Sequence, residues 1–280
     1  MKTAAALLLI CLAGCSESPS PPGIPPAPAP AATPAATVVV AEEPPAKLGQ
    51  DAEPLPEPPK AAAANTHKPL LPDKSLLLEV GRDPADATKS KPVRLLVACE
   101  VCPPTTLLEV FLCKTNTKEH EAVVRTGVDA KLLHGGLVAL GLAPGTPVRF
   151  VDPKTGEADY APATGAKVAV SVHYRRAGKL HTHPAQEWIT DLKTKKPMAH
   201  GWVFAGSRFL PYPDEPTRAP SYAANGGDVI AISNFVDSML DLPVSVGSDD
   251  AELSFGAATD RIPPPLSKVW VVLAAAVVGK

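Results

Sequence analysis

The sequence contains few of the residues that usually indicate a function. Of its 280 residues, 5% are aromatic and five are cysteine, and the formal net charge is −2. No block or stripe of basic residues occurs, so we expect no nucleic-acid partner. Lys193, Lys195 and Lys196 cluster beside Pro197, which is typical of a solvated turn.

The motifs of common enzyme classes are missing as well. There is no glycine-rich phosphate loop and no dinucleotide fingerprint. Ser207 follows Ala205-Gly206 and lacks the Gly-x-Ser-x-Gly elbow of hydrolases. The few aromatic residues are scattered, which favours core packing over a ligand-stacking platform. They include Trp188, Trp202, Phe204, Tyr222 and Phe235.

The first fifteen residues have the layout of an export signal. Lys2 precedes an apolar run from Ala4 to Leu12, which is shorter than the roughly 20 residues that span a bilayer. Leu12-Ala13-Gly14-Cys15 resembles a bacterial lipobox, which implies diacylglycerol attachment to Cys15, cleavage before it and acylation of the new amine. We therefore expect a signal peptide over 1–14. The alternatives are a signal peptide cut elsewhere and an uncleaved anchor.

Two or three acyl chains would anchor the protein stably to a membrane. Ser16 follows the cysteine where an Asp would favour retention in the inner membrane. We therefore expect an exported lipoprotein in the outer membrane, facing the periplasm.

A proline-rich segment follows. Residues 16–72 hold 16 of the 34 prolines and few large apolar residues. Such a segment favours extended polyproline II and cannot bury enough apolar surface to offset the entropy cost of ordering. We expect a disordered tether over 15–72 and one globular domain over 73–280, which is long enough for a full core.

Strand patterns dominate the globular part. Lys167–Tyr174 alternates between valines and smaller or polar residues, as a half-buried strand does, and Ala177-Gly178 then offers a hairpin turn into 179–189. Apolar runs predict the other strands. These are Pro92–Ala98, Leu107–Leu112, Met198–Ala205, Asp228–Ile232 and Lys268–Ala275.

One helix is well indicated over Asp129–Leu142, with Asp129 as the N-cap and glycine and proline beyond its end. Gly135 and Gly136 inside it favour close packing against a sheet. Lys118–Val124 is either a short helix or the start of a strand, and Asp249–Ala258 predicts a second short helix. The expected fold class is α+β, with a mostly antiparallel or mixed sheet.

Several segments from Glu109 to Ala274 together resemble the YdjY domain, as found in lipoproteins of planctomycete-type bacteria. They are Thr117–Val123, His134–Gly141, Pro144–Val148, Gly201–Ser207, Gly227–Phe235, Ser238–Val244 and Arg261–Pro264. The resemblance implies a fold unit, and it implies no catalytic residue because the family's chemistry is largely uncharacterised.

Three cysteines remain if Cys11 is removed and Cys15 is lipidated. Cys99 and Cys102 form a C-x-x-C, and Cys113 lies further along the chain. Such thiols can form a disulfide, stay inert, exchange redox equivalents, or bind zinc or an iron–sulfur cluster, with His120 as a possible fourth zinc ligand.

Two histidine segments are weaker candidates. His120 lies between two glutamates, so His120 and Glu121 could act as acid and base, although the pattern favours a capping or salt-bridged surface segment. His181 and His183 share one face of a strand and could bind copper or zinc with His173 across the hairpin; the alternative is an exposed polar face.

These observations favour a lipid-anchored, non-enzymatic binding or structural module of the cell envelope without a cofactor. Its partners would be the membrane, through the lipid, and an envelope protein or glycan. The alternative is a metal-binding or redox protein that uses Cys99, Cys102, Cys113 and His120, with zinc or an iron–sulfur cluster. A hydrolase built on His120 and Glu121 ranks last.

Overall fold

The computed structural model describes residues 49–62, 64–83, 85–103, 107–151, 154–246 and 254–276, which belong to one compact unit. The predicted signal peptide, Cys15 and the predicted tether up to residue 48 lie outside these ranges. None of the helices in the described ranges has the length and apolar character that a membrane span requires.

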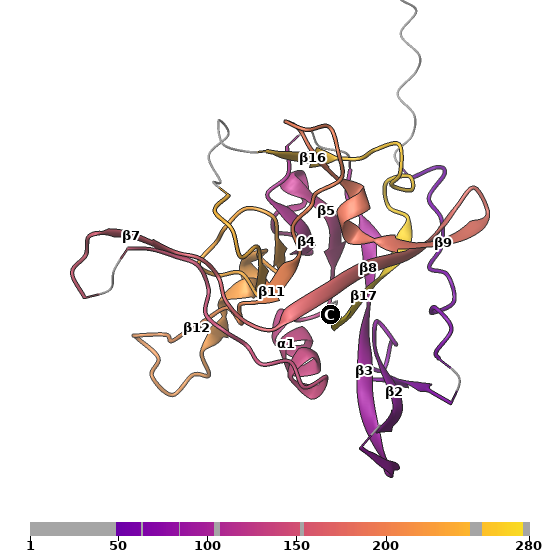
Figure 1. The fold of residues 1–280 in the computed structure, drawn as a ribbon, viewed down its shortest axis with the longest axis horizontal. Coiled ribbons are helices and arrows are strands. Elements are labelled where there is room, and N and C mark those ends of the chain that lie inside the picture. Colours follow the sequence, from indigo (N-terminus) through magenta and orange to yellow (C-terminus); the bar gives the residue numbers. More distant parts are fainter. Residues whose placement is uncertain are drawn as a thin grey trace, which may run out of the picture. The chain divides into compact units, whose positions relative to one another are not determined.

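Eight strands pair side by side into a closed barrel (Figure 1). The order is β3-β17-β8-β11-β15-β14-β4-β5, and β5 pairs back with β3. Pairs β14–β15 and β4–β5 are parallel, and the other six pairs are antiparallel. The strands are β3 (Asp86–Val101), β4 (Val110–Lys114), β5 (Ala122–Thr126), β8 (Lys167–Arg176), β11 (Trp202–Phe204), β14 (Ile230–Ala231), β15 (Leu240–Asp241) and β17 (Lys268–Ala275).

The expected α+β class is therefore wrong. The described residues form one α-helix and a closed barrel, which is a mostly β architecture. Strands such as β14 and β15 contain only two residues each. A strand this short has no periodicity that a sequence pattern can reveal, so the alternation of apolar and polar residues could not predict that the barrel closes.

Strand β3 is long enough to pair with three others. β17 pairs with it along residues 94–100 and occupies one edge. The other edge pairs first with β2 (Leu76–Asp83), as far as Val97, and then with β5 at Glu100 and Val101. Outside the ring, β1 (Thr66–Pro69) pairs with β2, so a strand forms inside the segment that was expected as tether.

The chain before β1 also contacts the sheet. Val271 of β17 faces the main core, whereas its neighbour Trp270 faces the opposite side of the sheet, where it packs with Leu96. On that side, Trp270 Nε1 donates a hydrogen bond of 2.9 Å to the carbonyl oxygen of Pro56, and Lys268 N donates one of 2.8 Å to Glu53. The ordered domain thus includes part of the predicted tether.

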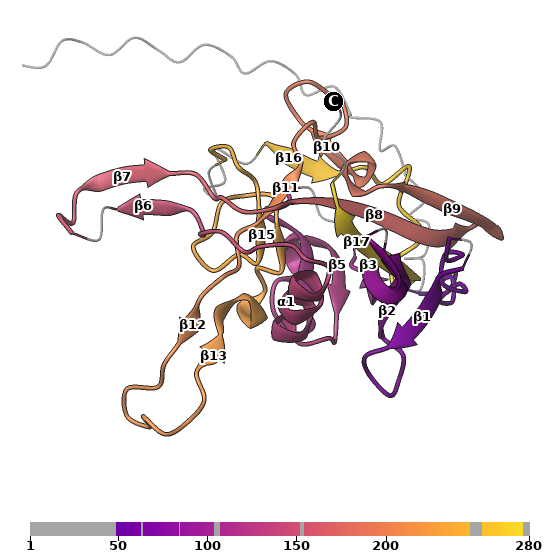
Figure 2. The same ribbon diagram turned by 60° about the horizontal axis from the view of Figure 1, so that its bottom comes forward.

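The fold also contains three further hairpins, and two of them project from the barrel (Figure 2). The projecting hairpins are β6–β7 and β12–β13, and the third pairs β8 with β9 through Ala177 and Gly178, both at positive φ. The bounds are β6 (Arg149–Val151), β7 (Ala158–Ala161), β9 (Lys179–Pro184), β12 (Phe209–Leu210) and β13 (Ser221–Tyr222).

Two further strands and three short 3-10 helices complete the described elements. Strand β10 (Ile189–Asp191) pairs with β16 (Phe255–Ala257). The 3-10 helices are η1 (Glu119–Glu121), η2 (Ala185–Trp188) and η3 (Ala223–Gly226).

The local predictions mostly hold. The predicted strands at 92–98, 107–112, 167–174, 198–205, 228–232 and 268–275 each contain or overlap a strand. The segment 118–124 contains both alternatives, because η1 leads directly into β5. The second predicted helix is wrong where residues are described, since β16 forms there.

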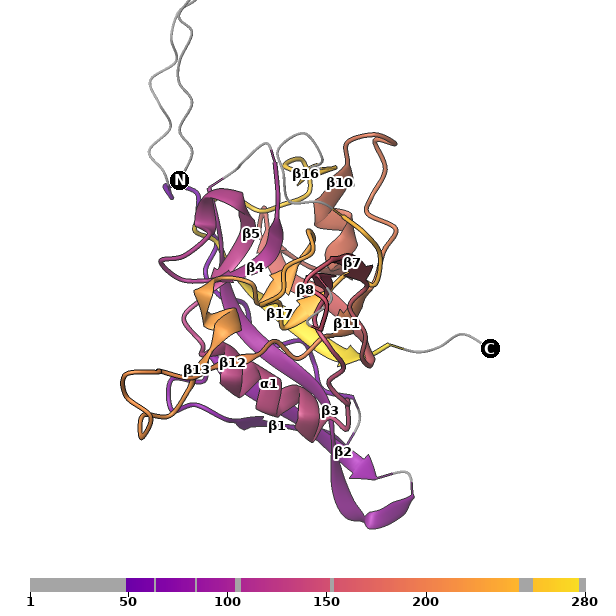
Figure 3. The same cartoon turned by 90° about the vertical axis from the view of Figure 1, so that its left-hand side faces the viewer.

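The predicted helix is confirmed as α1 (Ala130–Ala139), which lies beside β3 (Figure 3). The Asp129 side chain accepts a hydrogen bond from Lys131 N at 2.8 Å, as an N-cap does. At the other end, Gly141 N and Leu142 N donate to the carbonyls of Val138 and Leu137, with Gly141 at φ 82°. This pattern is a Schellman motif, which explains the glycine.

The two helix glycines should respond oppositely to alanine. A Cβ on Gly136 would lie 2.7 Å from Leu95 Cδ2, and Leu95 is fully buried, so Gly136→Ala should destabilise the domain by about 1–3 kcal/mol. A Cβ on exposed Gly135 meets nothing within 4 Å, so Gly135→Ala should stabilise it by up to about 1 kcal/mol. Urea unfolding of both variants measures this; equal effects would contradict the packing of α1 on β3.

Candidate functional site

The structure buries all three cysteines of the domain and leaves each as a free thiol. Cys99 lies on β3 within the main core. Cys102 follows the end of β3, and Cys113 lies on β4. These two belong to a separate small apolar cluster that also contains Ala122. The C-x-x-C is therefore split, and the close pair is Cys102 with Cys113.

Hydrogen bonding and burial set the protonation of these thiols. Burial raises the pKa of Cys99. The hydrogen bond between Cys102 and Cys113 raises the pKa of Cys102, and burial adds to this. The same bond lowers the pKa of Cys113.

Strand β5 separates the backbones of this pair. Cys102 N donates to Val123 O on β5 at 3.0 Å, while Cys113 is in register with Arg125 on the other side of β5. Strands two positions apart are separated by about 9–10 Å, beyond the roughly 7 Å between Cα atoms that a disulfide tolerates. The thiols can touch across Ala122, but a disulfide would require the backbone to move.

His120 does not join the cysteines. Its side chain is 77% exposed, and its Nε2 lies 3.7 Å from Glu121 Oε2. The thiols are buried, so the four candidate ligands do not converge. Within the described residues, no group of three or more His, Cys, Asp or Glu side chains is placed to hold a metal ion.

Glu121 is instead part of an ion cluster around Lys118. Lys118 Nζ lies 3.2 Å from Glu121, 3.2 Å from Asp228 and 3.4 Å from Glu109, and 4.0 Å above the Phe235 ring. Burial raises the pKa of Asp228, and burial together with the charge of Glu121 raises the pKa of Glu109. The cluster ties three segments together, and its one cation is shared by three acids.

The other three candidate histidines lie on the β8–β9 hairpin. The rings of His181 and His183 stack at 6.0 Å, as expected for alternate residues on one face, and His183 Nδ1 lies 3.0 Å from Glu187. His173 is in register with Thr182 and contacts its hydroxyl at 2.7 Å, so it faces the opposite side of the hairpin. The three imidazoles are not brought together.

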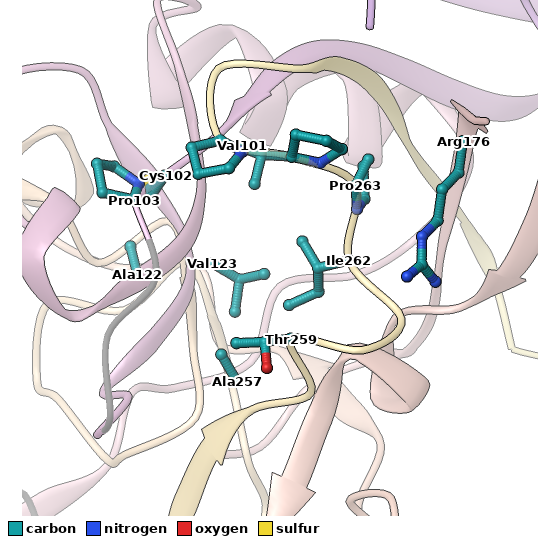
Figure 4. Close-up of a pocket in the computed structure, with 12 residues that line it drawn as sticks. Val101, Cys102, Pro103, Ala122, Val123, Arg176, Ala257, Thr259, Ile262 and Pro263 are labelled. Atoms are coloured by element: carbon teal, nitrogen blue, oxygen red, sulfur yellow. The ribbon is translucent and has the colours of Figure 1, made fainter. Parts of the chain in front are cut away.

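An apolar pocket of about 290 Å³ lies beside Cys102 (Figure 4). In Figure 4, Cys102 and Pro103 lie on one side, Ile262 and Pro263 on the other, and Arg176 beyond these. The walls come from the end of β3, the start of β5 and the loop between β16 and β17. The lining residues are Val101, Cys102, Pro103, Ala122, Val123, Arg176, Ala257, Thr259, Ile262 and Pro263–Pro265.

The chemistry of this pocket suits binding. Prolines have a fixed φ and no N–H donor, so Pro263–Pro265 form a stiff wall with few hydrogen-bonding groups. Among the lining residues, Arg176 carries the only charge, and the Cys102 thiol and Thr259 hydroxyl lack a neighbouring base in the lining. The volume is at the lower end of the range for small-molecule sites, so the pocket suits a small apolar group.

Sequence reasoning missed most of this pocket. Cys102 was a candidate, but Arg176, Ile262 and the proline run were not considered as site residues. The available signal was Arg261–Pro264, one of the segments that resemble a known family. Its role could not be read from the chain because its opposite wall is about 140 residues away in sequence, at Val123.

Comparison with known proteins identifies a family. A family model described as the YdjY domain matches residues 88–274. The matched range runs from within β3 to within β17, so it includes the whole pocket lining. No curated protein and no solved structure matches the chain.

The thiol arrangement can be tested chemically. We expect the protein, denatured without reductant and alkylated, to carry the label on Cys99, Cys102 and Cys113, because β5 prevents a disulfide between the last two. Site-resolved mass spectrometry measures this, with a reduced sample as the control for full labelling. A crosslinked Cys102–Cys113 peptide, or stoichiometric zinc or iron in the native protein, would contradict it.

Proposed function

The chain belongs to the YdjY domain family, and we propose that this member is a lipid-anchored, non-enzymatic binding module of the bacterial cell envelope. The observation that carries the binding role is the apolar pocket beside Cys102. It is open to solvent, it is bounded by segments distant in sequence, and it presents apolar surface without an acid–base pair.

The residues that could support catalysis form ion pairs and do not line the pocket. Lys118 forms ion pairs with three carboxylates, and His183 pairs with Glu187. The His120 side chain is exposed and does not line the pocket. This distribution supports a binding protein over a hydrolase built on His120 and Glu121.

The location is part of the proposal. The lipobox-like segment ending at Cys15 and the proline-rich segment after it support a domain held at a distance from the outer membrane, on its periplasmic side. In that position the pocket would take an apolar group of an envelope protein or glycan, or a small apolar molecule.

A redox or metal protein is the second candidate, and the hydrogen bond between Cys102 and Cys113 favours it. The measurements described above separate the two candidates, because an oxidised redox pair would give the crosslinked Cys102–Cys113 peptide and a metal site would give stoichiometric zinc or iron in the native protein.

The binding role predicts a defined dependence on ligand length. Each buried methylene contributes about 0.8 kcal/mol, so affinity for linear alcohols should rise about fourfold per carbon and then level off once the pocket is full. Calorimetry with butanol, hexanol and octanol measures this. Thr259 is exposed and lines the pocket, so Thr259→Trp should cover it and reduce binding at least tenfold.

Asp260→Trp is the matched control, because Asp260 is exposed beside Thr259 but does not line the pocket. It should leave alcohol binding unchanged. The binding role would be wrong if alcohols did not bind, or if both tryptophan variants weakened binding equally.

The anchor is tested separately. Cys15→Ser removes the sulfur that would carry the lipid, so the protein should leave the membrane fraction, whereas Cys11→Ser should not change fractionation. Fractionation followed by immunoblotting measures this. Continued membrane association of Cys15→Ser would overturn the anchor.

A further inference from the structure

Arg176 lies where two hollows of the surface meet. It lines the apolar pocket beside Cys102, and it also lines a neighbouring hollow of about 320 Å³ that contains Tyr174, His181 and Arg261. It is the last residue of β8, and its side chain is half-buried. Its guanidinium therefore lies at the polar edge of an otherwise apolar pocket (Figure 4).

The positive charge of Arg176 is not compensated by the protein. Within the described ranges, no carboxylate forms an ion pair with it, whereas Arg94, Arg125, Arg149 and Arg208 each have one within 4.0 Å. Its cross-strand neighbour is Lys179, which is also unpaired within those ranges. Like charges opposite each other on a sheet repel, so a bound anion between Arg176 and Lys179 would relieve this repulsion.

The nearby acids are already engaged. Glu187, in the neighbouring hollow, pairs with His183 at 3.0 Å. Glu53 accepts a hydrogen bond from Gly178 N at 3.3 Å at the tip of the hairpin. Arg261 donates to the carbonyl oxygen of Glu187 and lies 3.9 Å from Asp260. One guanidinium in the pocket thus remains available for one negative charge.

We propose that the pocket binds an amphiphilic carboxylate, whose apolar body occupies the space between Cys102 and Pro263 and whose carboxylate is bound by Arg176. This inference rests on the proposed binding function and adds the chemical class of the ligand. A guanidinium offers two parallel N–H donors that match the two oxygens of a carboxylate. A monoanion also matches the single unpaired cation of the pocket lining better than a dianion does.

The test compares octanoate with octanol, which have the same chain length and differ in charge. The protein is the full chain with Cys15→Ser, so that no attached lipid competes for the pocket. At pH 8 and low salt, octanoate should bind about tenfold more tightly than octanol, as a hydrogen bond to a charged group allows. Calorimetry measures both affinities, and added salt should reduce only the octanoate preference.

Variants of adjacent arginines assign the effect. Arg176→Gln should lower octanoate affinity about tenfold, to that of octanol, and should leave octanol binding unchanged. Arg176→Lys should retain part of the preference, because it keeps the charge but loses the planar fork. Arg175→Gln is the matched control, since Arg175 faces the other side of the strand and donates to Gly178 O at 2.9 Å.

Each outcome bears on one claim. Equal affinities for octanoate and octanol in the unsubstituted protein, or equal losses in the Arg175 and Arg176 variants, would overturn the carboxylate inference and leave the pocket's binding role intact. Tighter binding of octyl phosphate than of octanoate would overturn the assignment of a carboxylate. If neither octanoate nor octanol binds, the proposed binding function is wrong and the inference fails with it.

Discussion

Closure of the barrel depends on the short pairing of β5 with the end of β3. Because β2 occupies the same edge of β3 as far as Val97, β5 pairs there at Glu100 and Val101. The ion pair of Arg125 with Glu100 lies at this junction, and Lys268 of β17 also contacts Glu100. Ring closure thus combines two backbone positions with a three-residue charge cluster that links β3, β5 and β17.

This junction also positions the candidate site. The chain leaves β3 at Val101 and continues as Cys102 and Pro103, while β5 begins at Ala122 and Val123. All five residues line the pocket, so the same pairing that closes the ring forms one of its walls. The backbone separation of Cys102 from Cys113 follows from it too, because β5 lies between their strands.

The sequence predicted the long elements well and the closed architecture poorly. The apolar run at 268–275 coincides with β17, and Asp129 caps α1 as expected, because both signals are local. Closure of the barrel depends on very short pairings. β14 pairs with β15 at one residue of each strand, and the end of β3 pairs with β5 at two. No local pattern encodes a pairing between residues 100 and 125, so the prominent helix signal led to the wrong fold class.

In the candidate site, too, local patterns predicted positions correctly, whereas contacts between distant segments were missed. Alternation correctly placed His181 and His183 on one face, and the register of the hairpin placed His173 on the other. The cysteine spacing suggested a site at Cys99 and Cys102. The strand order instead places Cys102 near Cys113, on the far side of β5. The pocket wall at 257–265 carries no motif of known chemistry, because prolines and aliphatic side chains form a site only through where the fold places them.

The distribution of charge distinguishes the residues that hold the fold from the one that is left for a ligand. Several buried and half-buried charges are paired within the domain: Glu79 binds Arg94, Glu100 binds Arg125 and Lys268, and Lys118 binds three acids. Such compensation is required because an unpaired charge loses hydration on burial without regaining it. Neither Arg175 nor Arg176 forms an ion pair within the described ranges, but Arg175 donates to the carbonyl oxygen of Gly178, whereas Arg176 lies at the edge of an apolar pocket. A half-buried cation without a partner costs stability, and its presence there is best explained by an anion that the protein itself does not supply.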